Sequence, residues 1–209
     1  MITMKQLKSR EEWLEMRKYS IGGSDASSIL GLNPWKSNVK LWLEKKGIEK
    51  AEDISNKAIV KFGIDAENSI RELFALDHDN FEVQYLENNM WVNDKYSFAH
   101  ASLDGWLSYK GDEDNIKGIL EIKTTNMEWA DKIPDYYYTQ ILHYLMVTEF
   151  DFAILKARMK RLDGDIIVKH YMIRRKDVEN DIKLLAEKEK AFYESLKGDK
   201  VPNLILPDI

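Results

Sequence analysis

Residues 101–125 read ASLDGWLSYKGDEDNIKGILEIKTT, two apolar runs separated by a polar segment. The polar segment contains residues that favour tight turns: Gly111, Asp112, Asp114 and Asn115. We therefore predict that the two runs pair as an antiparallel hairpin. Such a pairing brings Asp104, near the start of the first run, toward Glu121 in the second.

Side chains alternate between the two faces of a strand, so Glu121 and Lys123 point to one face while Leu120 and Ile122 point to the other. Two neighbouring carboxylates repel each other, and the usual remedies are a raised pKa or a shared hard cation such as Mg²⁺. The alternative is structural: Glu121 and Lys123 form a half-exposed ion pair, and Asp104 caps a turn. At this point the residues leave both interpretations open.

Around the hairpin, hydrophobic periodicity and capping residues predict the other elements. The predicted helices are 9–18 with Ser9 as N-cap, a short helix from Ser24 to Gly31, a helix capped by Ser37 that ends at Gly47, and 55–77, 134–148 and 177–197. The predicted strands are 81–87, 96–109, 117–125, 151–160 and 165–176. This order makes the N-terminal fifth helical and predicts a mixed α/β (α+β) sheet flanked by helices.

The predicted helix 55–77 carries an acidic residue on an apolar face. Helical spacing places Val60, Ile64, Ile70 and Phe74 near one another, and Glu67 falls on the same face. A carboxylate in that position needs a partner or a function.

Residues 20–31, SIGGSDASSILG, place two glycines directly before a serine and an aspartate. One interpretation is an ordinary turn with Ser24 as a helix N-cap. The other is an anion pocket, in which glycine amides, the serine hydroxyl and a helix N-terminus converge on a phosphate.

Composition narrows the class of protein. With 209 residues, of which 44% are hydrophobic, one domain with a full core is expected. The chain has no cysteine, which excludes disulfides, cysteine-based zinc sites and cysteine-ligated iron–sulfur clusters. The polar N-terminus does not resemble a signal peptide, and no apolar run approaches the roughly 20 residues that span a bilayer, so we expect a soluble cytoplasmic protein.

The charge distribution is uneven. A net charge of −5 argues against a general nucleic-acid coat protein. Between residues 156 and 176, however, eight positive residues are opposed only by Asp163 and Asp165: Lys156, Arg158, Lys160, Arg161, Lys169, Arg174, Arg175 and Lys176. This basic segment is either a solvated hairpin or a surface that faces DNA.

Five blocks of the chain resemble, in order, the motifs of the PD-(D/E)XK nucleases in their YqaJ-like phage recombinase branch, which includes lambda exonuclease. The blocks are SIGGSDASSILGLNPWKS, FGIDAE, ASLDG, LEIKTT and YYYTQILHYLMV, within a resemblance that runs from Glu12 to Lys197. It implies one nuclease domain over 1–209, with a helical DNA-end-binding part at 1–50 and a restriction-endonuclease-like catalytic core at 51–209.

The resemblance also implies catalytic and metal-binding roles. Asp104 and Glu121 would be the metal-binding carboxylates, with the carbonyl of Ile122 as a further ligand. Glu67 would serve a second Mg²⁺ ion, with Mn²⁺ as an alternative metal. Lys123 would orient or activate the attacking water and stabilise negative charge on phosphorus. Gln140, on the helix face shared by Tyr136, Tyr137 and Tyr144, would hold a side chain or a water near the site.

Arg17, Ser24 and Ser102 match positions that contact DNA phosphates, and Arg17 with Ser24 would receive a 5′-phosphate. This favours the anion-pocket interpretation of the glycine segment. One departure is that Leu103 stands where the family commonly has a proline before the catalytic aspartate.

The resemblance thus implies a Mg²⁺-dependent 5′-to-3′ double-stranded DNA exonuclease of phage-type recombination that leaves a 3′ single strand. Its expected partners are double-stranded DNA ends, a single-strand annealing protein and further copies of itself in a trimeric ring, in the cytoplasm of a bacterial host. A restriction-like or nicking endonuclease on the same core is one alternative. A catalytically silent DNA-binding protein is another, although intact Asp104, Glu121 and Lys123 argue against it.

Overall fold

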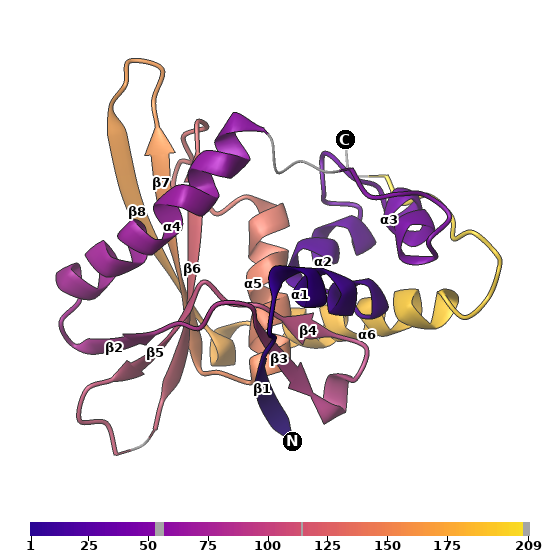
Figure 1. Ribbon diagram of the computed structural model, residues 1–209, viewed down its shortest axis with the longest axis horizontal. Coiled ribbons are helices and arrows are strands. Elements are labelled where there is room, and N and C mark those ends of the chain that lie inside the picture. The colour runs from indigo at the N-terminus through magenta and orange to yellow at the C-terminus, as the bar shows by residue number, and fades with distance from the viewer. Residues whose placement is uncertain (53–56, 114, 207–209) are drawn as a thin grey trace.

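The computed structural model describes residues 1–52, 57–113 and 115–206. Its centre is a five-stranded sheet in the order β2-β5-β6-β7-β8 (Figure 1). The strands are β2 (Phe81–Gln84), β5 (Gly105–Tyr109), β6 (Lys117–Thr125), β7 (Phe152–Lys160) and β8 (Ile166–Arg174). Strands β6 and β7 run parallel and all other neighbours antiparallel, which confirms the predicted mixed sheet.

Helices pack on both faces of this sheet (Figure 1). Helix α4 (Ala58–Asp77) covers one face, where Ile70 and Phe74 meet Leu120 and Ile122 of β6 in a small core. Helix α5 (Asp135–Thr148) covers the other face within a larger core that includes Ile119 of β6. Burial on both faces explains why β6 is apolar at most positions, so its charged residues stand out.

The remaining helices gather on the α5 side of the sheet (Figure 1). They are α1 (Arg10–Met16), the 3₁₀ turn η1 (Arg17–Tyr19), α2 (Gly23–Ile29), α3 (Asn38–Lys45) and the closing helix α6 (Glu179–Ser195), with further 3₁₀ turns η2 (Asp94–Tyr96) and η3 (Arg175–Asp177). In the described part of the chain, no helix combines the length and the apolar character that crossing a membrane requires.

A second, three-stranded sheet has the order β1-β3-β4. Its strands are β1 (Ile2–Gln6), β3 (Asn89–Asn93) and β4 (His100–Ala101). The prediction of an entirely helical N-terminal fifth is therefore wrong, because residues 2–6 pair with a strand far along the chain. The predicted strand 96–109 is likewise divided into β4 and β5, and Asp104 lies between them.

Local capping predictions had mixed outcomes. Ser9 and Ser37 are N-caps, and their hydroxyls accept from the backbone N–H groups of Glu12 and Lys40, both at 3.2 Å. Ser24 is not the cap of α2, because Gly22 occupies that position and donates its N–H to the Asp25 carboxylate at 3.0 Å. An acidic residue three positions after the cap therefore closes this helix end.

The apolar face predicted for 55–77 is buried only in its C-terminal half. Ile70 and Phe74 are in the core, but Ile64 is 51% exposed and lines a cleft. The buried-face prediction is thus wrong for Ile64. Residues 55 and 56 of the predicted helix, and Asp114 of the predicted turn, lie outside the described residues.

Gly118 of β6 lies where the side chains of the sheet are tightly packed. A Cβ atom there would lie 2.2 Å from the Phe152 ring, which also contacts the rings of Phe81 and Tyr109. We expect Gly118→Ala to lower the free energy of unfolding by about 1–3 kcal/mol, because the ring cannot move aside freely. Urea denaturation measures the change.

The matched control is Gly198→Ala, since the nearest atom to a Cβ at Gly198 is the Ser195 carbonyl oxygen at 3.8 Å. That variant should stay within about 0.5 kcal/mol of wild type. Equal stabilities for the two variants would contradict the packing described for β6.

Candidate active site

The site lies where β5 and β6 separate. Strand β5 pairs with β6 only as far as Gly105 opposite Leu120, whereas β6 continues beside β7 to Thr125. Asp104 immediately precedes β5, and its carboxylate accepts the Ile122 N–H at 2.8 Å. The Asp104 side chain thus takes the place of a neighbouring strand, which fixes it beside the exposed edge of β6.

Glu121 and Lys123 both point to the α5 side of the sheet, as their alternation predicts. Lys123 Nζ lies 2.5 Å from Glu121 Oε1, and Gln140 Nε2 of α5 donates to the same oxygen at 2.9 Å. Gln140 also bonds the Tyr144 hydroxyl at 2.7 Å. Glu121 is only 1% exposed, so the interpretation as a half-exposed surface ion pair is wrong.

The second carboxylate oxygen of Glu121 is an unusual feature. Glu121 Oε2 is buried and has no hydrogen-bond partner among the described residues. A buried acceptor without a donor is costly, and such atoms in folded proteins call for an explanation. A cation in contact with Oε2 would supply the missing interaction. A free carboxylate oxygen is also a ligand atom that Mg²⁺ prefers, so this position fits a metal ion.

Helix α4 brings Glu67 to the same cleft, together with an arginine that the sequence analysis missed. Arg71 bonds Glu67 Oε1 at 2.6 Å and donates from Nε to the Asp104 carbonyl at 2.6 Å. Its guanidinium carbon also lies 3.6 Å from the centre of the Tyr85 ring. The available signal was spacing, since residues four apart on a helix are neighbours.

Asn89 of β3 holds the segment that precedes Asp104. Its side chain accepts the Leu103 N–H and donates to the Leu103 carbonyl, both at 2.9 Å. A proline at position 103 would have no N–H to donate. This chain therefore fixes the backbone before Asp104 through a buried asparagine, a role that no local pattern around Leu103 indicates.

Burial and mutual repulsion raise the pKa values of the carboxyls. Burial, and then the charge of Asp104, raise the pKa of Glu121 to about 8 and that of Glu67 to about 7. Burial also raises the pKa of Asp104. Although burial alone lowers the pKa of Lys123, Glu121 and Asp104 raise it above its ordinary value, so Lys123 is a cation at neutral pH.

With pKa values of about 8 and about 7, Glu121 is mostly protonated and Glu67 partly protonated at pH 7, and a bound cation would favour the release of these protons. In the described ranges, however, no three acidic or histidine side chains are grouped as a metal-ligand cluster. Asp104 and Glu121 could hold a cation only with ligands of another kind, such as a backbone carbonyl, water or phosphate oxygens.

Arg17 and Ser24 lie on the other side of the cleft. Arg17 Nη2 donates to Ser24 Oγ at 3.2 Å, and the Arg17 guanidinium lies over the Trp13 ring at 4.3 Å. Trp13 in turn donates from Nε1 to Ser102 Oγ at 2.9 Å. The three residues predicted to contact phosphate are therefore linked by Trp13, which the sequence analysis did not single out.

One open cleft of about 580 Å³ collects nearly all the predicted site side chains. Its lining includes Glu67, Asp104, Glu121, Lys123, Gln140, Arg17, Ser24 and Ser102. The Ile122 side chain is the exception, because it points into the core beneath α4.

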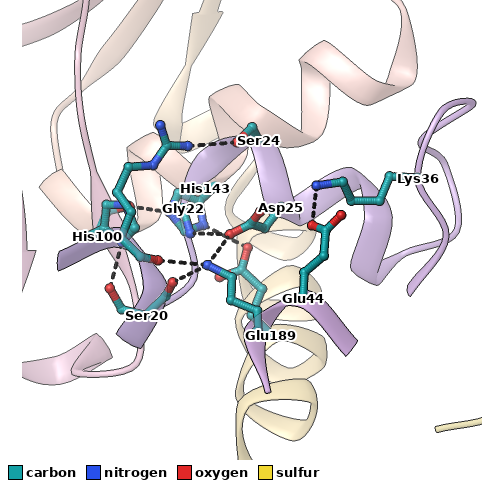
Figure 2. Close-up of polar contacts among 11 residues, drawn as sticks. Ser20, Gly22, Ser24, Asp25, Lys36, Glu44, His100, His143 and Glu189 are labelled. Carbon is teal, nitrogen blue, oxygen red and sulfur yellow. Dashed lines mark hydrogen bonds and ion pairs between the residues drawn. The ribbon is translucent and has the colours of Figure 1, made fainter. Parts of the chain in front are cut away.

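Lys45 of α3 holds the segment around Gly22 and Gly23, which lines the cleft. Lys45 Nζ donates to the carbonyls of Arg17 and Ser20 at 2.9 and 2.7 Å, and it pairs with Asp25 at 2.8 Å. Figure 2 shows how Ser20, Gly22 and Asp25 converge there. Despite its burial, Asp25 has a pKa lowered to about 2 by Lys45, so the ion pair persists at neutral pH.

Close approach explains the two glycines. A Cβ at Gly23 would lie 2.4 Å from the Tyr144 ring, and one at Gly22 would lie 3.0 Å from His100 Nε2. His100 is fixed by Ser20 Oγ at Nδ1 and by His143, which donates from Nε2 to the His100 carbonyl at 2.8 Å (Figure 2). The segment therefore packs directly on the side chains that flank Gln140 and the cleft.

Comparisons with known proteins show the family of the chain. A family model described as YqaJ-like viral recombinase domain matches residues 12–151. The uncharacterized protein YqaJ of Bacillus subtilis (strain 168) is 37% identical over 144 residues, which cover 66% of this chain and 42% of that protein. Protein D345L of African swine fever virus (strain Badajoz 1971 Vero-adapted) is 28% identical over 152 residues, covering 63% and 43%. The matches span less than half the length of these relatives.

Among solved structures, the alkaline exonuclease LHK-Exo from Laribacter hongkongensis has a TM-score of 0.63 at 15% identity, covering 90% of this chain and 92% of that chain. The structure of LHK-Exo in complex with dAMP gives a TM-score of 0.64 at 17% identity with the same coverage. Identities this low show a shared fold alone, which agrees with the fold class that the sequence predicts.

The raised pKa of Glu121 predicts a pH-dependent cost to stability when metal is absent. The folded protein holds a proton up to about pH 8, whereas the unfolded chain releases it near the ordinary pKa of 4.5. The free energy of unfolding therefore loses a contribution as pH rises from about 4.5 to about 8. Glu121→Gln removes the titrating group. Its free energy of unfolding, relative to that of wild type, should therefore rise by roughly 2 kcal/mol or more between about pH 5 and about pH 9.

Urea denaturation in the presence of a chelator measures this difference at the two pH values. A stability difference between Glu121→Gln and wild type that does not change with pH would show that Glu121 is not held protonated by its surroundings.

Proposed function

The chain belongs to the family of YqaJ-like viral recombinase domains, and from that premise we propose that it is a metal-dependent deoxyribonuclease that digests duplex DNA from a 5′ end. Its product would be duplex DNA with a 3′ single strand. The observation that carries the proposal is the grouping of Asp104, Glu121 and Lys123 at the fork of β5 and β6, with a buried acceptor oxygen left free on Glu121.

In this proposal Asp104, Glu121 and the Ile122 carbonyl hold a Mg²⁺ or Mn²⁺ ion, and Glu67 serves a second ion or its waters. The bound ion would polarise the scissile phosphate and lower the pKa of a coordinated water. Lys123 would orient or activate the attacking water and, as a cation, donate to the oxygens that gain negative charge on phosphorus. Gln140 holds Glu121 Oε1, so Oε2 would be available to bind the ion.

The Arg17 and Ser24 side of the cleft supports the polarity of the proposal. A guanidinium beside a hydroxyl suits a terminal phosphate, which carries more negative charge than an internal one. A pocket for a chain end favours an exonuclease over a restriction-like or nicking endonuclease. LHK-Exo, which shares the fold, has been crystallised with dAMP, a nucleoside monophosphate of the kind that an exonuclease releases.

A trimeric ring and a single-strand annealing partner complete the proposal, but the basic segment contributes fewer free cations than the sequence suggests. Lys156 is buried beside Asp77, Arg161 is paired with Glu128, and Arg175 with Glu179. A channel through which DNA passes would therefore need other positive residues in its lining, among them Arg10 at the cleft.

Removing any of the three central side chains should abolish cleavage. Asp104→Ala, Glu121→Ala and Lys123→Ala are each expected to slow the digestion of linear duplex DNA in Mg²⁺ by at least about 100-fold, because the first two remove ligands of the proposed ion and the third removes a cation beside the reacting phosphate. Release of a label from the 5′ or the 3′ end of the duplex measures both rate and polarity.

Lys190→Ala, an exposed change on α6, is the matched control and should keep wild-type activity. Cleavage by Asp104→Ala at the wild-type rate would contradict the assignment of the active site. Cleavage of closed circular DNA at the same rate as linear DNA would show that the protein is an endonuclease and not an exonuclease.

Arg17→Ala should reduce the preference for a 5′-phosphate. On duplexes that differ only in a 5′-phosphoryl or 5′-hydroxyl end, we expect the ratio of initial rates to fall by roughly 10-fold or more, because a charge-assisted hydrogen bond is lost. Lys18→Ala, in the same turn but exposed and paired with Glu15, should leave the ratio unchanged. An equal loss of rate on both ends would make Arg17 a structural residue instead.

A further inference from the structure

A row of aromatic side chains leads away from Lys123 toward solvent. Lys123 Nζ lies 5.1 Å from the centre of the Tyr137 ring, the Tyr137 and Tyr136 ring centres are 4.4 Å apart, and Tyr136 meets Trp35 at 5.0 Å. The row ends at Trp35, which is 68% exposed. A tryptophan this exposed is an unusual use of a large apolar surface, because burial is normally its main contribution.

The chain holds Trp35 rigidly in this exposed position. Asn33 Oδ1 accepts the backbone N–H groups of Trp35 and Lys36 at 2.9 and 3.0 Å, and Asn33 Nδ2 donates to Ser27 Oγ at 3.2 Å. Lys36 is paired with Glu44 of α3 at 2.5 Å. The loop is therefore fixed on both sides of Trp35, so a ligand that stacks on the ring would lose little entropy in ordering it.

We propose that Trp35, Tyr136 and Tyr137 form a stacking site for the bases of single-stranded DNA beside the catalytic Lys123. The inference rests on the proposed nuclease function, because a duplex digested from one end has unpaired bases next to the scissile phosphate. Lys123 lines the cleft, and the rings follow one another from Lys123 to the exposed Trp35, so a strand that leaves the cleft on this side would meet an exposed ring.

The chemistry of the row favours bases over phosphates. Stacking on aromatic rings is tolerant of sequence, because every base has an aromatic face. The nearest lysine in the loop, Lys36, is already paired with Glu44, so the row itself offers no free cation from that loop for backbone phosphates. Binding at Trp35 should therefore add affinity without adding to the salt dependence, which reports phosphate contacts.

The test is the affinity of a 3′-fluorescein-labelled, 5′-hydroxyl thymidine oligonucleotide, measured by anisotropy in a chelator so that no cleavage occurs. The 5′-hydroxyl removes any contribution of a terminal phosphate at Arg17. Trp35→Ala should weaken binding by roughly 5- to 100-fold, the loss typical of one stacked base, at both low and high salt. Trp35→Phe should retain most of the affinity, because it keeps a ring at that position.

Two matched controls separate stacking from general effects. Leu162→Ala removes an even more exposed apolar side chain on the β7–β8 hairpin and should leave the oligonucleotide affinity unchanged. An abasic oligonucleotide of the same length should bind wild type and Trp35→Ala equally, because it offers phosphates without bases.

Unchanged oligonucleotide affinity in Trp35→Ala, or no oligonucleotide binding by wild type, would overturn the inference. The inference would also fail if Trp35→Ala had a lower molecular mass than wild type by light scattering while its oligonucleotide affinity stayed the same. That result would make the aromatic row an interface between copies of the chain. If wild type bound the oligonucleotide through Trp35 yet cleaved no DNA, the stacking site would stand and the proposed nuclease function would fail.

Discussion

The crowding of carboxylates at the fork of β5 and β6 is the constraint on which the rest of the site depends. Asp104 replaces a strand partner of Ile122, and the alternation of β6 places Glu121 beside it. Neither group can leave, because one is fixed by a backbone hydrogen bond and the other is buried. Burial, and then repulsion by Asp104, raise the pKa of Glu121 to about 8, and ionising both groups creates a demand for positive charge that Lys123 meets only in part.

Both faces of the sheet contribute to meeting that demand. Helix α5 supplies Gln140 to orient Glu121, and α4 supplies Glu67 with Arg71, which also bonds the Asp104 carbonyl. Helices from two separate cores thus act on one strand end. An arrangement that buries repelling groups is poor for stability in the absence of a ligand, which is typical of sites organised for charge stabilisation during a reaction.

The side of the cleft that carries Arg17 and Ser24 is organised by one partly buried lysine. Lys45 bonds the carbonyls of Arg17 and Ser20 and pairs with Asp25, so it joins the turn that carries Arg17 to the helix that carries Ser24. Gly23 then packs on Tyr144, the residue that also contacts Gln140. The two sides of the cleft are therefore in direct contact, although their residues are distant in sequence.

The sequence by itself determined what depends on neighbouring residues: the β5–β6 hairpin, the alternation that separates Glu121 and Lys123 from Leu120 and Ile122, and the caps at Ser9 and Ser37. These follow from period-two pleating and from hydrogen bonds within three residues. Only the tertiary structure decided the pairing of β1 with β3, the hydrogen bonds between the Asn89 side chain and the Leu103 backbone, the cap at Gly22 and the exposure of Ile64. Each of these depends on a partner distant in sequence or on which half of a helix meets the sheet, and no local pattern of residues records either.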